Sequence, residues 1–124
     1  MKSGIYCLQG PGGIMLAKRI RYCRGPWFRM KGLLGRKQLS PDEGIYLCPC
    51  NSIHMFFMKF PIDVLFVDQS MRILRIDDSI RPWRVTPLVK GAHAAFELSA
   101  GKARETRLSI GDQLTLSTEP ASAS

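Results

Sequence analysis

The stretch from His54 to Asp68 is the most apolar part of the chain, and it constrains the fold more than any other segment. Pro61 divides it, because proline cannot donate a hydrogen bond to a sheet ladder. The residues on either side predict two strands, over 53–59 and 62–67. A polar turn over 68–71 and strand-forming residues up to position 76 follow. The sequence therefore predicts a β-hairpin over residues 62–76.

Asp63 interrupts the second of these strands, whose two faces are otherwise apolar. A strand of this kind is covered on both sides, and a buried carboxylate needs a cation or several hydrogen-bond donors to offset its lost hydration. We predict that Asp63 accepts hydrogen bonds from backbone amides or from Arg36. Such bonds favour the charged form, so the prediction includes a pKa below the reference value of about 3.9.

Proline and glycine divide the rest of the chain into short segments. Eight prolines and eleven glycines among 124 residues leave little room for long helices. We therefore expect a mainly β, compact domain of sandwich, jelly-roll or barrel-like type with one or two short helices. Its expected bounds are 14–116, with a loosely ordered N-terminus over 1–13 and a disordered tail over 117–124.

Several further elements follow from the pattern of apolar and turn residues. Gly25-Pro26 opens a short helix that ends at Gly35, and a helical turn is expected between Ala100 and Thr106. The remaining expected strands cover residues 14–22, 45–47, 94–98 and 113–116.

No segment has the apolar run of a signal peptide or the roughly 18 apolar residues of a membrane span. This favours a cytoplasmic protein without a membrane span. We expect the four cysteines, at positions 7, 23, 48 and 50, to be reduced thiols, because a domain held together by disulfides normally has more cysteines for its length.

Charge is unevenly distributed. The net charge is +8, and the first 41 residues hold nine basic side chains and no acidic one. A basic region of this kind suits an anionic ligand, an acidic protein partner or an anionic surface, or it is a solvated edge that discourages strand aggregation. No aromatic stacking pattern, helix-turn-helix or zinc-finger spacing supports nucleic-acid binding.

The segment from Cys48 to His54 has the most reactive composition. Cys48, Cys50 and His54 supply three ligands for a metal such as zinc, which would need a fourth from elsewhere. Cys50 and His54 alternatively resemble a nucleophile and its base. Cysteines beside strands are also often inert small hydrophobic residues, so no cofactor is required.

Trp83 lies in a proline-bracketed loop between two arginines. A large aromatic residue in a loop usually anchors it, so we expect the indole to pack over one end of the core. The alternative is that Trp83 is presented beside cations at a binding site.

An ordered set of short motifs carries a resemblance. These motifs are GLLGR at 32–36, DEGI at 42–45, FMK at 57–59, PIDVLFVD at 61–68, FELSAG at 96–101 and IGD at 110–112. With this set the chain resembles the bacterial and archaeal family known as domain of unknown function 192 over about residues 14–116. The resemblance implies a small, mainly β domain, and it implies no established activity.

Two functional classes remain open. The first is a non-catalytic binding or accessory module, which the lack of a cofactor loop favours. The second is an enzyme that uses Asp63 and Glu97 as a carboxylate pair, or the cysteine and histidine pair described above. The predicted pocket of the binding module is formed by Arg36, Lys59, Asp63, Trp83 and Glu97.

Overall fold

The computed structural model describes residues 5–24, 38–55 and 58–118. Its seven strands form one sheet in the order β5-β4-β6-β3-β2-β1-β7. All neighbours are antiparallel except β2 and β3. The strands are β1 (Ile5–Gln9), β2 (Met15–Cys23), β3 (Glu43–Leu47), β4 (Ile62–Val67), β5 (Ile73–Ile80), β6 (Ala94–Ser99) and β7 (Thr115–Ser117), and the described residues also contain a 3-10 turn η1 (Pro11–Gly13) and one short helix α2 (Lys102–Glu105).

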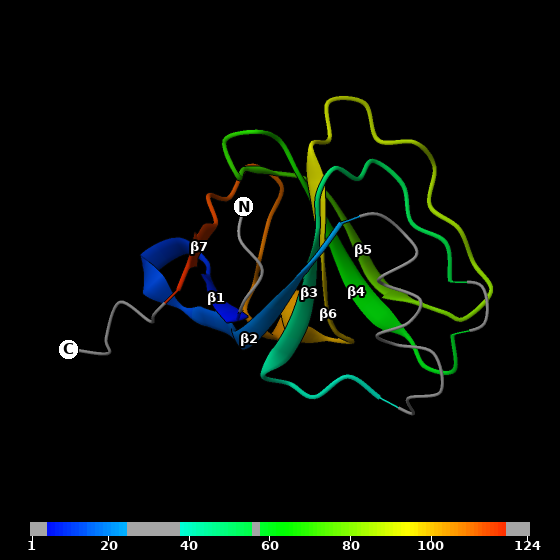
Figure 1. Cartoon of the computed structure of the whole chain (residues 1–124), viewed down its shortest axis with the longest axis horizontal. Helices are drawn as coiled ribbons and strands as arrows, with labels where there is room; N and C mark the ends of the chain where they lie inside the picture. The colour runs from blue at the N-terminus through cyan, green and yellow to red at the C-terminus, as the bar shows by residue number, and fades with distance from the viewer. Residues whose placement is uncertain (1–4, 25–37, 56–57, 119–124) are drawn as a thin grey trace.

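The sheet curls so that its two edges approach each other (Figure 1). Arg72 forms an isolated antiparallel bridge with Gln113, which brings the start of β5 to the segment before β7. The Ile73 amide donates to the Asp112 carbonyl at 3.0 Å, and the Gly111 amide donates to the Ile73 carbonyl at 2.7 Å. The result is a curled half-barrel, which confirms the prediction of a mainly β, barrel-like fold.

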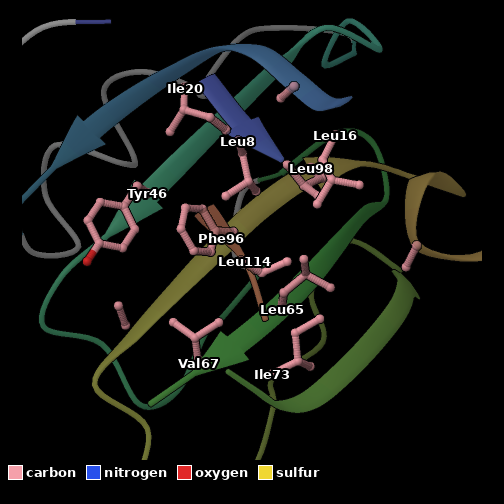
Figure 2. Packing of buried hydrophobic residues seen from close by; sticks show 13 residues of the cluster. Leu8, Leu16, Ile20, Tyr46, Leu65, Val67, Ile73, Phe96, Leu98 and Leu114 are labelled. Atoms are coloured by element: carbon pink, nitrogen blue, oxygen red, sulfur yellow. The ribbon is translucent and has the colours of Figure 1, made fainter. Parts of the chain in front are cut away.

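One hydrophobic cluster fills the concave side of the curled sheet (Figure 2). Strands alternate their side chains between the two faces, so every strand of the sheet can contribute to this interior. Its largest fully buried members are Leu8, Leu16, Ile20, Leu65, Ile73, Phe96, Leu98 and Leu114.

A second hydrophobic cluster lies on the convex face. It joins alternate residues of the central strands, among them Phe66 and Ala95, to residues of the loops that cover them, such as Met55 and Phe60. The loop segments over 51–55 and 83–89 are joined by backbone hydrogen bonds and lie beside each other over this face (Figure 1). The central strands are therefore buried on both sides, as the residues of β4 indicated.

The hairpin predicted over 62–76 is confirmed by β4 and β5. The strand predicted over 53–59 is wrong for its described residues, which contain only one bridge, from His54 to Val85. Ile53 and Met55 instead exchange backbone hydrogen bonds with the loop around Trp83 to Thr86, so their polar groups are satisfied away from the sheet.

The N-terminal segment also differs from expectation. Residues 5–9 form β1, which pairs with β2 on one side and β7 on the other, so the prediction of a loosely ordered segment over 1–13 is wrong there. Ser117, expected in the disordered tail, belongs to β7. The predicted helix between Gly25 and Gly35, and tail residues 119–124, lie outside the described residues.

Candidate functional site

The structure does not bring the predicted pocket residues together. Val64 is the cross-strand partner of Glu97, whereas Asp63 is the partner of Leu98. Neighbouring partners share a face of a sheet, so Asp63 points to the concave side and Glu97 to the convex side. These two carboxylates therefore cannot act on one group as a pair.

The other described members of the predicted pocket have exposed side chains. Lys59 is exposed, and Arg36 lies outside the described residues. Trp83 is 59% exposed, so the prediction that its indole packs over the core is wrong. The alternative, an aromatic side chain presented beside cations at a binding site, stays a prediction.

Asp63 is fully buried and joins three segments of the chain. Its Oδ1 accepts hydrogen bonds from the Ser79 amide at 2.8 Å and the Gly101 amide at 3.0 Å, and its Oδ2 accepts one from the Ala103 amide at 2.8 Å. A bulge in the β4–β5 pairing and the positive φ of 52° at Ser79 accompany the first bond. Backbone amides, the first of the two predicted kinds of donor, are thus its observed partners.

The predicted direction of the Asp63 pKa is wrong. Burial raises the pKa of this carboxyl, and the hydrogen bonds from Ala103, Ser79 and Gly101 lower it by less. The nearby Asp78 raises it further. Loss of hydration therefore outweighs the three donors. Asp63 serves to hold β4, β5 and the α2 turn together rather than to face a ligand.

Glu97 is also fully buried, among the convex-side residues. It lies near Cys23, whose pKa is raised mainly by burial and additionally by Glu97, with Arg21 acting in the opposite direction. A thiol with a raised pKa is a poor nucleophile at neutral pH. Cys23 is therefore a packing residue.

A thiol and an imidazole meet at the end of β3. Cys48 follows this strand directly, and His93 precedes β6. Cys48 Sγ lies 3.3 Å from His93 Nε2. The predicted cysteine and histidine pair was Cys50 with His54, whereas the close contact is between Cys48 and His93. The two residues are 45 positions apart, so local spacing could not reveal it; the one available signal was that each flanks a predicted strand.

Tyr46 adjoins this contact from the concave side. Burial raises the pKa of Tyr46, and a hydrogen bond with the Cys48 side chain raises it further. The Tyr46 ring stacks on Phe96 with a centroid distance of 4.7 Å. The aromatic residues thus hold one side of the thiol against the core, and Tyr46 stays a neutral phenol at physiological pH.

A hollow of about 400 Å³ opens beside the same contact. Its wall consists of two short loops, the first after β4 and the second before β6. The Asp68 carboxylate accepts hydrogen bonds from the Ser70 and Arg72 amides through Oδ1, which orders the first loop. The lining residues are Asp68, Gln69, Ser70, Gly91, Ala92 and His93.

The predicted metal ligands are separated in the described chain. Cys48 contacts His93, while the Cys50 thiol donates to the Ser52 carbonyl at 3.2 Å. His54 forms its backbone bridge with Val85. Across residues 5–24, 38–55 and 58–118, no three His, Cys, Asp or Glu side chains are grouped as a metal ion would require.

The fold and the hollow define a small, mainly β module with a polar recess at the ends of its central strands. The chain belongs to the family of domain of unknown function 192, described as "Uncharacterized ACR", whose model matches residues 10–116. No helix in the described part of the chain has the length and apolar character needed to cross a membrane.

Two relatives carry the name "UPF0127 protein". The one from Thermococcus sibiricus is 37% identical over a match of 94 residues, and the match covers 69% of this chain and 58% of the relative. The one from Pyrococcus abyssi is 32% identical over 63 residues, covering 51% of this chain and 53% of the relative. The chain thus matches little more than half the length of these relatives.

Two crystal structures share the fold. A protein of unknown function from Novosphingobium aromaticivorans superposes with a TM-score of 0.76 and 22% identity, over 91% of this chain and 84% of the other. A proposed transcription regulator from Sinorhizobium meliloti gives a TM-score of 0.73 and 22% identity, over 93% and 95%. At this identity the likeness concerns the fold alone.

Proposed function

We propose that this protein is a non-catalytic binding module whose ligand occupies the hollow beside His93. The observation that carries the proposal is the recess of about 400 Å³ with a mostly polar wall. Recesses of this volume are the usual sites for small molecules. Asp68 is the carboxylate in the wall, so the recess favours a small ligand that is rich in hydrogen-bond donors.

Native mass spectrometry of freshly purified protein tests this proposal directly. We expect a retained small molecule in the parent, and its loss in Ala92→Phe, because the added ring would fill the recess. Ala100→Phe is the matched control, since Ala100 is exposed and does not line the recess. Equal retention by both variants, or none by the parent at high protein concentration, would refute this site.

The same spectrum tests the zinc site predicted from Cys48, Cys50 and His54. A mass increment of one zinc ion that disappears in Cys50→Ser would support it. We also propose a cytoplasmic location, which is supported by the four free cysteines, since reducing compartments keep thiols unpaired.

A second candidate function is thiol chemistry at Cys48, favoured by the 3.3 Å contact with His93. In this proposal His93 Nε2 accepts the thiol proton, and the sulfur attacks an electrophilic carbon and displaces its leaving group, which is iodide when the probe is iodoacetamide. Alkylation of Cys48 by iodoacetamide should then slow several-fold in His93→Gln. Cys50→Ser serves as the control and should leave the rate at Cys48 unchanged. An unchanged rate in His93→Gln would show that the imidazole does not activate the thiol.

A further inference from the structure

The loop between β5 and β6 exposes three large apolar side chains within six residues. The exposed fractions are 59% for Trp83, 61% for Val85 and 76% for Leu88. Single exposed apolar residues are ordinary, but a local group of them indicates an interaction surface. We call the exposed side chains of residues 81–90 the loop surface.

The same loop carries only positive charge. Arg81, Arg84 and Lys90 are exposed, and no acidic residue occurs between positions 79 and 96. The covering segment over 48–60 likewise contains Lys59 and no carboxylate. Cations therefore flank the apolar side chains along the sequence, and neither segment contains an acidic residue that could neutralise them.

The backbone of the loop is held in place. The Trp83 amide donates to the Met55 carbonyl at 2.7 Å, and the Thr86 amide donates to the Ile53 carbonyl at 2.8 Å. The buried Thr86 hydroxyl also accepts the Ile53 amide at 2.9 Å. Pro82 and Pro87 have no amide hydrogen to satisfy. The loop surface can thus leave water without stranding these donors.

We propose that the loop surface docks on an anionic lipid surface, with Trp83, Val85 and Leu88 entering the interface and Arg81, Arg84 and Lys90 contacting headgroup phosphates. Tryptophan prefers the boundary between headgroups and acyl chains, and aliphatic side chains gain by entering it. Cations near an anionic leaflet add to this attraction. A purely acidic peptide would neutralise the cations but would offer no apolar contact to Leu88 and Val85.

Co-sedimentation of the full chain with phosphatidylcholine vesicles, with and without phosphatidylglycerol, tests the proposal. We expect binding to the anionic vesicles and a strong loss of binding at high salt. Leu88→Ser should weaken the partition about tenfold, because it removes the most exposed aliphatic side chain of the loop surface. Ile110→Ser is the matched control, since Ile110 is 68% exposed but lies elsewhere in the chain. This variant should bind the vesicles as the parent does.

The charges are tested by a pair of variants with equal net charge. Arg81→Gln with Arg84→Gln should weaken the partition about 25-fold, at roughly a factor of five for each cation. Lys18→Gln with Arg19→Gln removes two exposed cations from β2 and should change it only a few-fold. Quenching of tryptophan fluorescence by brominated lipid should occur in the parent and largely disappear in Trp83→Phe.

The outcomes separate docking at this loop from other causes. Equal losses in the two charge variants would overturn the proposal in favour of general attraction of a basic protein. No binding to the anionic vesicles would overturn it outright. Binding of polyglutamate with the same sensitivity to Leu88→Ser would show an acidic protein partner instead. All substituted side chains are exposed, so thermal melts should match the parent.

Discussion

At the scale of single residues, Asp63 is the side chain on which most of the local structure depends. Asp63→Ala would leave the amides of Ser79, Gly101 and Ala103 without their acceptor. We expect a loss of about 2 to 4 kcal/mol in the free energy of unfolding, since a stranded buried donor costs about 1–3 kcal/mol and the exposed Ser79 can recruit water. Urea unfolding measures this. Asp63→Asn keeps one oxygen acceptor and should lose less; an equal loss would contradict the account.

The raised pKa of Asp63 makes a prediction about pH. A folded-state pKa above the unfolded value means that the folded protein binds the proton more tightly. Its contribution to stability therefore declines as pH rises from the unfolded pKa through the folded one. Asp63→Asn has no group that titrates at this position. The free energy of unfolding of the parent, minus that of Asp63→Asn, should therefore fall as the pH rises across the acid range. A rise would show that the three amides outweigh burial.

Residue roles were predictable where they depend on neighbours in sequence. The alternation of side chains along β4 was enough to identify Asp63 as buried and in need of hydrogen-bond donors. The residues of β4 are otherwise apolar on both faces, which indicates that both faces are covered. The direction of its pKa shift depends on the balance between burial and three donors from distant segments, and the sequence alone does not show that balance. The contact of Cys48 with His93 and the recess likewise depend on how β3, β4 and β6 are ordered in the sheet, which no local pattern states.

At the scale of elements, β3 packs closely enough to require glycine at position 44. A Cβ added there would lie 2.6 Å from Ile20 Cδ1, 2.8 Å from Leu98 Cδ2 and 2.9 Å from the Glu97 carbonyl oxygen. Because the last contact is with backbone, it cannot be relieved by a rotamer change. Gly44→Ala should cost about 1–3 kcal/mol in a thermal or urea melt.

Gly10→Ala is the control for this prediction. Its added Cβ would meet only side chains, the nearest being Ile14 Cγ2 at 3.1 Å. These can move, so we expect a smaller loss than at Gly44. A similar loss at both positions would mean that backbone contact does not decide the cost.

The central hairpin supplies a further test. Phe66 is fully buried on the convex face of β4. Phe66→Ala should cost about 3–5 kcal/mol, because it removes a large ring and leaves a cavity. Ile110→Ala, at an exposed position, should stay within about 0.5 kcal/mol of the parent. A loss below about 1 kcal/mol at Phe66 would show that the convex cluster closes over the missing ring.

The sequence predicted the positions of most strands, but it predicted a pairing only for the β4–β5 hairpin. The β4–β5 hairpin is formed across a short polar turn, so alternation and turn chemistry both lie within one stretch. By contrast, β1 was missed although it pairs with β2 across a short turn, because the proline and glycines of that turn read as a loose N-terminus and its other partner, β7, is distant in the sequence. The strand predicted at 53–59 failed because another distant segment, the loop around Trp83, takes up its backbone groups.

At the scale of the whole molecule, the two hydrophobic clusters share their strands. The concave cluster uses Leu65 and Phe96, while the convex cluster uses Phe66 and Ala95 from the same two strands. We therefore expect one cooperative unfolding transition. Leu8→Ala on the concave side should shift it, as Phe66→Ala does on the convex side, by about 2–5 kcal/mol. Circular dichroism and tryptophan fluorescence should coincide; two separate transitions would show that the clusters unfold independently.

The pairing of β1 with β7 has a consequence for protein synthesis. Cys7 and Ser117, which contact each other, are separated by 110 positions. At roughly 5 to 20 residues per second, a ribosome needs roughly 5 to 22 s to deliver the second after the first. Throughout that interval the outer edge of β1 has no native partner, and an open strand edge is a template for wrong pairing. A nascent chain of this protein should therefore depend on chaperones more than its small size suggests, and slower translation should increase that dependence.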